Sequence, residues 1–319
     1  MHLTIAICTW NRADSLSRTL SSLRNLELPE STEIHLVVVD NNCTDATPRI
    51  VADAQLPFLC TRVSETNSGL SHARNAAVVF ARARNSDFII FTDDDVEVER
   101  DWLAAYHAAF VSSAGVSVFG GPVTPVFARE PEPWMRRNMF AFRGPFVLVD
   151  HGEHDRMVGA SHDMPFGANM AYRLAAMPTG QPFDVELGVA PGRRMGGEET
   201  DLSRRILLER GEEWAYVSRA RVRHHLPERI VSPDYLFMHL RSTGRLTALL
   251  AARHGPLPMR RPPLWLVRCY VTTWVLRRCC WLTRNFAGPY ARHFSHEAMF
   301  RGQLDIYRAP KAAGEQYER

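Results

Sequence analysis

The sequence lacks any run of about 18 consecutive uncharged apolar residues, so we expect no transmembrane helix. It also lacks a basic N-terminal segment followed by a signal cleavage site. None of its six cysteines forms a C-x-x-C pair, and reduced thiols are the simplest explanation of their spacing. Together these absences predict a cytoplasmic protein.

Several catalytic motifs are missing as well. The chain contains no G-x-x-x-x-G-K-[ST] phosphate loop, no G-x-G-x-x-G after its first apolar run, no G-x-S-x-G elbow and no H-E-x-x-H pair. Each of these motifs places a nucleophile, a phosphate cradle or a metal ligand that its enzyme class needs. Kinase-like, dehydrogenase, esterase and zincin functions are therefore excluded.

The overall composition is that of a folded enzyme, but its charge is unevenly distributed. The 319 residues are 45% hydrophobic and 23% charged, with 38 basic and 35 acidic side chains and a formal charge of +3. That balance argues against a nucleic-acid partner. Residues 251–319 carry 12 basic and 4 acidic side chains, which leaves 26 and 31 in residues 1–250. All basic residues except Lys311 are arginine, a bias that codon composition explains.

Short β-branched runs alternate with helical patterns in the first half of the chain. Strands are predicted at residues 3–9, 34–40, 59–64 and 88–92, and helices at 13–26, 45–54, 71–84 and 102–113. This alternation predicts an α/β protein whose mostly parallel sheet has helices on both faces, a Rossmann-like nucleotide-binding fold. Ligands of such sheets bind beyond the carboxyl ends of the strands.

The second half is less regular. A strand is predicted at 116–123, a last strand at 214–225 and a helix at 232–253. Residues 124–165 are rich in proline, arginine and aromatic residues without clear periodicity, which indicates a mobile or acceptor-facing excursion. We expect a catalytic domain over residues 1–250 and a helical extension over residues 251–319.

Three adjacent carboxylates, Asp93, Asp94 and Asp95, follow the fourth predicted strand. Adjacent carboxylates repel one another unless a positive charge lies nearby. Mg²⁺ or Mn²⁺, which prefer oxygen ligands, would supply that charge. A solvated acidic turn or a helix N-cap is the alternative interpretation.

Two further segments have the chemistry of a nucleotide site. Asp40 ends the second predicted strand, where a base or ribose is commonly bound, although an Asx turn or a helix cap would use the same residue. Asp45 is expected to be such a cap. Asn67 and Arg74 belong to a loop that enters a helix, an arrangement suited to a diphosphate, with a capped helix and a surface arginine as the alternative.

Glu198 and Glu199 begin a predicted helix directly after two glycines. Acidic residues at a helix start usually interact with the macrodipole, the role expected for Asp201. A carboxylate beside a glycine-rich loop can also accept the proton of an acceptor hydroxyl. His224 and His225 end the last predicted strand, where either imidazole could meet a metal or be structural.

Taken in order, these segments resemble the family 2 glycosyltransferases of the GT-A fold over about residues 3–250. The segments that carry the resemblance are TWNR at 9–12, VVVDNN at 37–42, NSGLSHARN at 67–75, FTDDDV at 91–96, FGAN at 166–169, GGEETDL at 196–202 and VRHH at 222–225. Each is weakly specific by itself, whereas seven in the same order and spacing are specific.

The resemblance implies roles for residues at the donor site. The nucleotide base and ribose would be held by Thr9, Asn11, Arg12 and Asp40, with Asn67 and Arg74 completing the pocket. Asp95 would bind Mn²⁺ or Mg²⁺, and Asp93 and Asp94 would touch the ribose or the sugar. His224 would approach the metal from the other side, with His225 as the alternative.

The resemblance also implies an inverting reaction in which Glu199 is the catalytic base. The family commonly has aspartate at this position, so the Glu198–Glu199 pair leaves open which glutamate takes the proton. The chain has no Q-x-x-R-W element, which favours transfer of one sugar per encounter over processive synthesis.

The predicted function is therefore metal-dependent transfer of one sugar from a nucleotide-sugar donor, UDP being favoured by the resemblance. The acceptor would be a hydroxyl of a saccharide, a lipid-linked molecule or a small molecule. A sugar nucleotidyltransferase is one alternative, since it also needs a nucleotide site and a metal. A non-catalytic relative that binds a sugar nucleotide or a glycan is another, which the intact acidic motifs disfavour.

The C-terminal segment at 264–286 interleaves tryptophan with arginine. Such a composition is typical of contact with an anionic membrane surface, and equally of packing against the catalytic domain or a second subunit. We expect residues 255–290 to make a peripheral contact at the inner face of the cell membrane or to form a homo-oligomer. A helical wheel places Arg268 and Arg277 on opposite sides, so the pattern is not that of a simple amphipathic helix.

Overall fold

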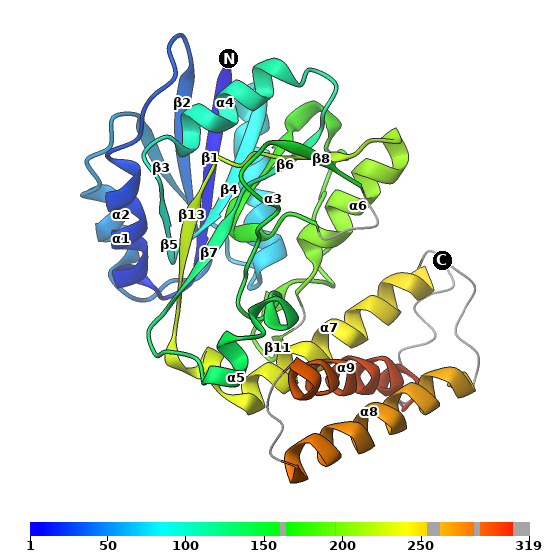
Figure 1. Ribbon diagram of the computed structural model, residues 1–319. Helices are drawn as coiled ribbons and strands as arrows, with labels where there is room; N and C mark the ends of the chain where they lie inside the picture. Colours follow the sequence, from blue (N-terminus) through cyan, green and yellow to red (C-terminus); the bar gives the residue numbers. More distant parts are fainter. Residues whose placement is uncertain (160–163, 195, 254–261, 284–287, 309–319) are drawn as a thin grey trace. The chain divides into compact units, whose positions relative to one another are not determined.

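The computed structural model describes residues 1–159, 164–194, 196–253, 262–283 and 288–308 (Figure 1). The chain divides into two compact units. The sheet unit comprises Met1–Val126 and Val147–Leu226, and the helical unit comprises Phe127–Phe146 and Pro227–Arg319. This division differs from the boundary expected at residue 250, because the helix at Pro233–Arg253 packs with the C-terminal helices.

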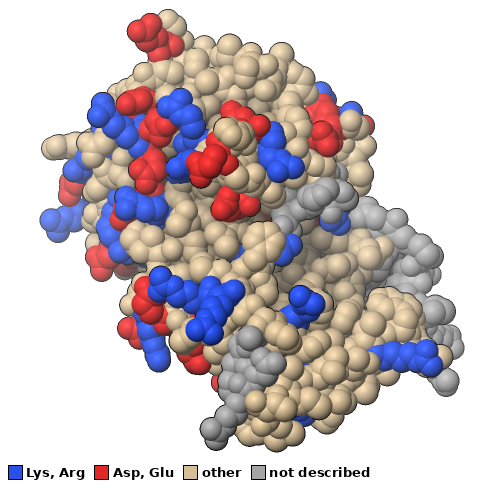
Figure 2. Space-filling view, in the orientation of Figure 1, with Lys and Arg blue, Asp and Glu red and all other residues tan. Residues whose placement is uncertain are grey.

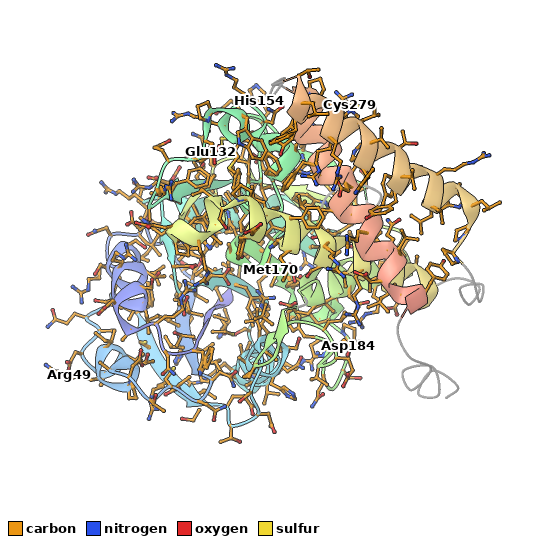
Figure 3. The ribbon with its side chains drawn as sticks, turned by 90° about the horizontal axis from the view of Figure 1, so that it is seen from below. Arg49, Glu132, His154, Met170, Asp184 and Cys279 are labelled. Atoms are coloured by element: carbon orange, nitrogen blue, oxygen red, sulfur yellow. The ribbon has the colours of Figure 1, made fainter. Side chains whose placement is uncertain are left out.

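Within the described residues, the sheet unit contains an eight-stranded sheet in the order β3-β2-β1-β4-β9-β6-β12-β8. The strands are β1 (His2–Thr9), β2 (Glu33–Asp40), β3 (Leu59–Ser64), β4 (Phe88–Asp93), β6 (Val118–Gly120), β8 (Arg156–Val158), β9 (Met170–Arg173) and β12 (Trp214–Tyr216). β1 to β4 are mutually parallel, as is β12 with β6. β9 runs antiparallel between β4 and β6, and Met170, at its start, is labelled in Figure 3. The predicted α/β fold class is confirmed.

Helices cover this sheet because each carries an apolar stripe. They are α1 (Ala13–Leu23), α2 (Thr47–Ala52), α3 (Leu70–Ala83), α4 (Trp102–Ser112) and α6 (Glu198–Arg210). On α1 the stripe consists of Leu16, Leu20 and Leu23, all fully buried. The connection from β1 to β2 and the connection from β3 to β4 run in opposite directions along the sheet, so right-handed crossovers place α1 and α3 on opposite faces.

The reversal of strand order lies between β1 and β4, which are hydrogen-bonded neighbours. Their carboxyl ends, at Thr9 and Asp93, are therefore the expected position of a ligand. The predicted cap Asp45 supports this region: its Oδ1 accepts the N–H of Thr47 and its Oδ2 accepts that of Ala13. One carboxylate thus holds the starts of α1 and α2.

A second sheet of the sheet unit has the order β5-β13-β7, formed by β5 (Val96–Val98), β13 (Val222–Leu226) and β7 (Val123–Phe127). The single strand predicted at 214–225 is wrong, since β12 and β13 belong to different sheets. A turn separates them, in which Ala220 N–H donates to the carbonyl of Val217. β10 (Val189–Ala190) and β11 (Arg193–Arg194) form a small antiparallel hairpin.

The helical unit is built from α5 (Pro133–Arg136), α7 (Pro233–Arg253), α8 (Leu264–Leu282) and α9 (Gly288–Asp305). α7 and α9 approach closely at two glycines. A Cβ on Gly244 would lie 2.0 Å from the carbonyl oxygen of Met299, and one on Gly302 would lie 1.9 Å from that of Arg241. Of the helices in the described part of the chain, none combines the length and apolar content that crossing a bilayer requires.

Part of the excursion expected at 124–165 is core of the helical unit instead. Met135, Phe142 and Phe146 are fully buried, and the Trp134 ring packs on Phe142, Tyr290 and Phe294. The aromatic residues that broke the periodicity of this segment are therefore explained by packing against α9. Residues 160–163 of the same stretch lie outside the described part of the chain.

Candidate active site

Four of the predicted residues form one cluster where β1 and β4 end; Thr9, Asp94 and Asp95 are buried and Arg12 is exposed. Thr9 Oγ1 donates a hydrogen bond to Asp94 Oδ2 at 2.7 Å, and Arg12 Nη1 donates to Asp94 Oδ1 at 2.8 Å. The other guanidinium nitrogen of Arg12, Nη2, lies 2.7 Å from Asp95 Oδ2. Both oxygens of Asp94 are thus engaged by the protein, and a contact of Asp94 with the donor stays a prediction.

Asp93, Asp95 and His224 form a group that could hold a metal ion. Each offers one ligand atom, and these atoms all lie within 4.8 Å of one another. Strand pairing brings the histidine there, because His224 is opposite Val96 in the ladder between β13 and β5. His225 is directed elsewhere and places its Nε2 2.8 Å from Glu97 Oε1. The geometry therefore selects His224 over His225.

The donor set fits a divalent cation. Two carboxylates and one imidazole suit Mn²⁺, which accepts both oxygen and nitrogen ligands. Asp95 Oδ1 is buried, lies 2.9 Å from His224 Nε2, and accepts no well-directed hydrogen bond from a described residue. A cation between these groups would supply the missing interaction.

Burial and neighbouring charges shift the pKa values within this cluster. Burial raises the pKa of Asp94 to about 7, against the opposing charge of Arg12. Burial also raises the pKa of Asp93, which lies near Asp95. For Asp95 the effect of burial is outweighed by His224 and Arg12, so its pKa is lowered. The carboxylate beside His224 is accordingly the one most strongly held in its charged form.

The residues predicted to hold the nucleotide lie mainly around the end of β2. Asp40 Oδ1 accepts the N–H of Cys43, and its Oδ2 accepts a hydrogen bond from Arg62 Nη1, both at 2.8 Å. Asn11 has a positive φ of 52° and accepts the N–H of Thr44 through its Oδ1. The exposed Asn67 donates to Glu65 Oε1. Asp40 therefore stabilises the turn that follows β2, which is the alternative role considered for it in the sequence.

Arg62, which pairs with Asp40, is not among the site residues predicted from the sequence. It lies on β3 in register with Val38, two positions before Asp40, and its side chain is partly exposed. The sequence contains no signal for this pair, because register across a parallel ladder depends on the sheet.

Arg74 is buried instead of facing solvent. Its Nη1 contacts Glu198 Oε1 and lies 3.7 Å from Glu199 Oε2, while its Nη2 lies 3.7 Å from Asp93 Oδ1. Gly167 makes room for it, since a Cβ there would be 1.9 Å from Arg74 Nη2. Arg74 thus connects the metal-ligating group to the glutamate pair. The interpretation of a surface arginine is excluded.

The two glutamates at the start of α6 have different surroundings. Gly197, with a φ of 100°, turns the chain into the helix. Glu198 is 1% exposed and contacts Arg74, whereas the Glu199 side chain is 17% exposed. Burial, reinforced by the charge of Glu199, raises the pKa of Glu198 to about 8. Asp201 pairs with Arg205 at 2.8 Å and lies outside this network.

Asn169, from the FGAN segment, has a structural role in the same region. Its amide nitrogen donates to the carbonyls of Pro122 and Ala220, and its oxygen accepts hydrogen bonds from Trp102 and Tyr106. The side chain is fully buried and all of its capacity is used within the protein. It therefore fixes the segment that contains Gly167.

Comparison with known proteins identifies the family. A model described as Glycosyl transferase family 2 matches residues 4–177, more than half of the chain. The Succinoglycan biosynthesis protein ExoM of Rhizobium meliloti (strain 1021) is 28% identical over 264 residues, which span 80% of this chain and 77% of that protein.

Two solved structures share the fold. One is the mannosyltransferase PcManGT from Pyrobaculum calidifontis in complex with GDP-Man and Mn²⁺, with a TM-score of 0.54 at 18% identity. The match covers 99% of this chain and 76% of the PcManGT chain. The other is S. aureus TarS in complex with UDP-GlcNAc, with a TM-score of 0.53 at 17% identity. The match covers 100% of this chain and 93% of the TarS chain. With the matched model spanning most of the β1–β9 region, this chain belongs to glycosyl transferase family 2 and is a glycosyltransferase of the GT-A fold.

Proposed function

We propose that this glycosyltransferase moves one sugar from a nucleotide-sugar donor to an acceptor hydroxyl with inversion at the anomeric carbon. The observation that carries the proposal is the position of Arg74 between Asp93 and the glutamate pair. It connects a group suited to the diphosphate side of a donor with a group suited to activating an acceptor. The complexes of the two solved relatives with GDP-Man and UDP-GlcNAc support a nucleotide-sugar donor.

The nucleotide would bind beyond the ends of β1 and β2. Asp40 ends β2, and Asn11 and Asn67 come from neighbouring loops. Asn41 joins the loop after β2 to the loop after β3 through hydrogen bonds from its Nδ2 to the carbonyls of Glu65 and Asn67. Thr9 and Arg12 act through Asp94, which they hold in place. We propose UDP as the nucleotide, on the family resemblance.

Asp93, Asp95 and His224 would hold Mn²⁺ or Mg²⁺, and the Mn²⁺ in the PcManGT complex supports the first of these. When bound, such a cation neutralises the charge that develops on the departing diphosphate. Arg12 contributes positive charge to the same end of the site through its contacts with Asp94 and Asp95.

Glu199 is the better candidate for the base. A general base must be deprotonated at the working pH and must reach the acceptor proton. Glu198 is enclosed, contacts Arg74 and has a raised pKa, whereas Glu199 is partly exposed. Glu198 would instead position Arg74 and thereby Glu199.

In the proposed reaction, Glu199 takes the proton of the acceptor hydroxyl as its oxygen forms a bond to the anomeric carbon. The bond from that carbon to the diphosphate oxygen breaks, and the nucleoside diphosphate leaves with the electron pair. Attack opposite to the leaving group inverts the configuration. The acceptor would be a saccharide, a lipid-linked molecule or a small molecule, and the likeness to a succinoglycan biosynthesis protein supports the first.

The test is to incubate the protein with a panel of UDP- and GDP-sugars and Mn²⁺ and to measure the nucleotide released. Free UDP or GDP, formed faster when an acceptor extract is added, is the expected result. Release of pyrophosphate from a sugar phosphate and a nucleoside triphosphate would identify a nucleotidyltransferase instead. Tight binding of a nucleotide sugar without turnover under any condition would identify a non-catalytic relative.

A further inference from the structure

The outward face of α8 is a large apolar surface of the helical unit. α8 packs against α9 through a side that includes the buried Leu266 and Thr273. Its other side exposes apolar residues along the whole helix, among them Leu264 at 79%, Trp265 at 58% and Leu282 at 72%. The remaining large apolar residues of this face are Val271, Trp274, Val275, Leu276 and Trp281. Figure 3 shows α8 with the exposed Cys279 labelled on it.

The charged residues of α8 itself are all arginine. α8 contains no acidic residue, and its exposed charges are Arg268 and Arg278. In α9 the acidic residues are Glu297 and Asp305, and each is paired with an arginine, Arg277 and Arg241 respectively. In Figure 2 the surface over α8 shows tan and blue atoms without red on the side in view.

The tertiary structure also explains why α8 does not look amphipathic in sequence. Arg277 lies on the inward side and places its Nε 2.5 Å from Glu297 Oε2, a carboxylate that is almost fully buried. Its charge is therefore balanced inside the unit. The outward side retains the tryptophans and two exposed arginines, Arg268 and Arg278. Arg278 stacks 3.8 Å above the Trp274 ring, and its Nη1 lies 3.9 Å from Glu297 Oε1, so it shares with Arg277 a single negative charge.

We propose that the outward face of α8 lies flat on an anionic lipid bilayer and attaches the glycosyltransferase to it. At 19 residues the helix is about 28 Å long, and the apolar side chains along it would enter the boundary between headgroups and acyl chains. Tryptophan is enriched at that boundary, and arginine there binds anionic headgroups.

The charge pattern favours a bilayer over a second copy of this chain. A two-fold contact of α8 with α8 would bring the same surface against itself. Arg268 and Arg278 would then face arginines of the partner. α8 has no carboxylate, and the Glu297 carboxylate near Arg278 is already paired with Arg277. Anionic phosphates in a lipid surface supply the opposite charge without such repulsion.

The experiment measures flotation of the full-length protein with two kinds of vesicle. One consists of phosphatidylcholine alone, and the other also contains about 40% of the anionic lipid phosphatidylglycerol. The test variant replaces Leu264, Trp265 and Leu282 by serine. The matched control replaces Val79, Val111 and Leu208 of the sheet unit by serine, which are 61%, 63% and 63% exposed. Circular dichroism melting of both variants checks that they remain folded.

We expect the unmodified chain and the control variant to float with anionic vesicles at least tenfold more than with neutral ones, and the α8 variant to lose at least tenfold of this binding. Arg268→Gln with Arg278→Gln is expected to weaken binding several-fold and to reduce its sensitivity to salt. Equal flotation of the α8 variant and the control would overturn the proposal. So would a concentration-dependent dimer, seen by light scattering, that the α8 variant abolishes.

Discussion

The sheet unit and the helical unit treat charged side chains in opposite ways. In the sheet unit Asp94, Asp95, Glu198 and Arg74 are buried and directed at one another where the strands end. In the helical unit the buried carboxylate of Glu297 lies within 4 Å of both Arg277 and Arg278, and among the described arginines Arg268 and Arg278 are exposed. Buried charges interact strongly because the surrounding dielectric is low, whereas exposed charges act over a surface and are screened by salt.

This difference assigns different tasks to the two units. A network of buried charges costs desolvation energy, which is tolerated where pKa shifts and fixed positions serve a reaction. An apolar face with exposed arginines does not hold its charges in fixed positions, and it suits binding to a broad anionic surface. The predictions below test whether chemistry is confined to the first unit, in order of decreasing effect.

Asp95→Asn is expected to have the largest effect. The change removes a charge from the group that would hold the cation, so transfer measured by nucleoside diphosphate release should fall about 10³-fold. Binding of Mn²⁺, followed by calorimetry, should be lost as well. Asp53→Asn, at an exposed carboxylate directly after α2, serves as the control. Transfer within tenfold of the unmodified enzyme would remove Asp95 from the site.

Glu199→Gln should lower transfer by about 10²-fold or more while leaving Mn²⁺ affinity unchanged, since glutamine cannot accept the acceptor proton. Glu198→Gln keeps an oxygen for Arg74 and should stay within about tenfold. The two variants differ by one position in α6 and control for each other. The opposite ranking would make Glu198 the base.

Gly167→Ala and Gly244→Ala compare overpacking in the two units. Each added Cβ would lie well inside the van der Waals distance of a neighbouring atom. A Cβ on Gly167 would be 1.9 Å from Arg74 Nη2, and one on Gly244 would be 2.0 Å from the carbonyl oxygen of Met299. Both should lower the free energy of unfolding by about 1–3 kcal/mol in urea denaturation. Only Gly167→Ala should also lower kcat, because it displaces Arg74. Gly115→Ala, which meets nothing within 4 Å, should be neutral. Equal loss of kcat in both units would contradict the division of tasks.

Glu198→Gln tests the narrowest effect, a change in stability that is confined to one pH window. The pKa of Glu198 is raised from 4.5 to about 8, so between these values the native state holds a proton that the unfolded state releases. Stability of the unmodified protein therefore decreases as pH rises through this window, by at most about 1.4 kcal/mol per pH unit. Glutamine removes that contribution, and the difference in Tm should shift in favour of the variant from pH 5 to pH 8. A constant difference would show that Glu198 is ionised throughout.

Much of the fold followed from local pattern. The predicted strands at 3–9, 34–40, 59–64 and 88–92 match β1 to β4 within one residue, since continuous β-branched runs indicate buried parallel strands. The antiparallel strand β9 was not predicted. Its four residues are too few to show a period, and its place between β4 and β6 depends on pairings distant in sequence.

The candidate site was predictable to the extent that its residues end strands or begin helices. Asp93, Asp95 and His224 were singled out by residue type and position, and strand pairing between β5 and β13 then distinguished His224 from His225. The sequence assigns Arg74 to the nucleotide because an arginine near a helix N-terminus suits a diphosphate and because the family resemblance implies this role. Its burial depends on Gly167, which lies more than 90 positions away and leaves the space it occupies.

The sequence by itself determined that this chain forms a parallel α/β sheet, that carboxylates gather at the strand ends, and that arginine and tryptophan concentrate near residue 270. Each of these depends on interactions within a few residues. Only the tertiary structure decided that Arg74 connects Asp93 to the glutamates and that Arg277 is balanced by Glu297. The partner of a buried charged side chain cannot be predicted from the local sequence, because an ion pair in the interior depends on which segments meet and on how much water they exclude.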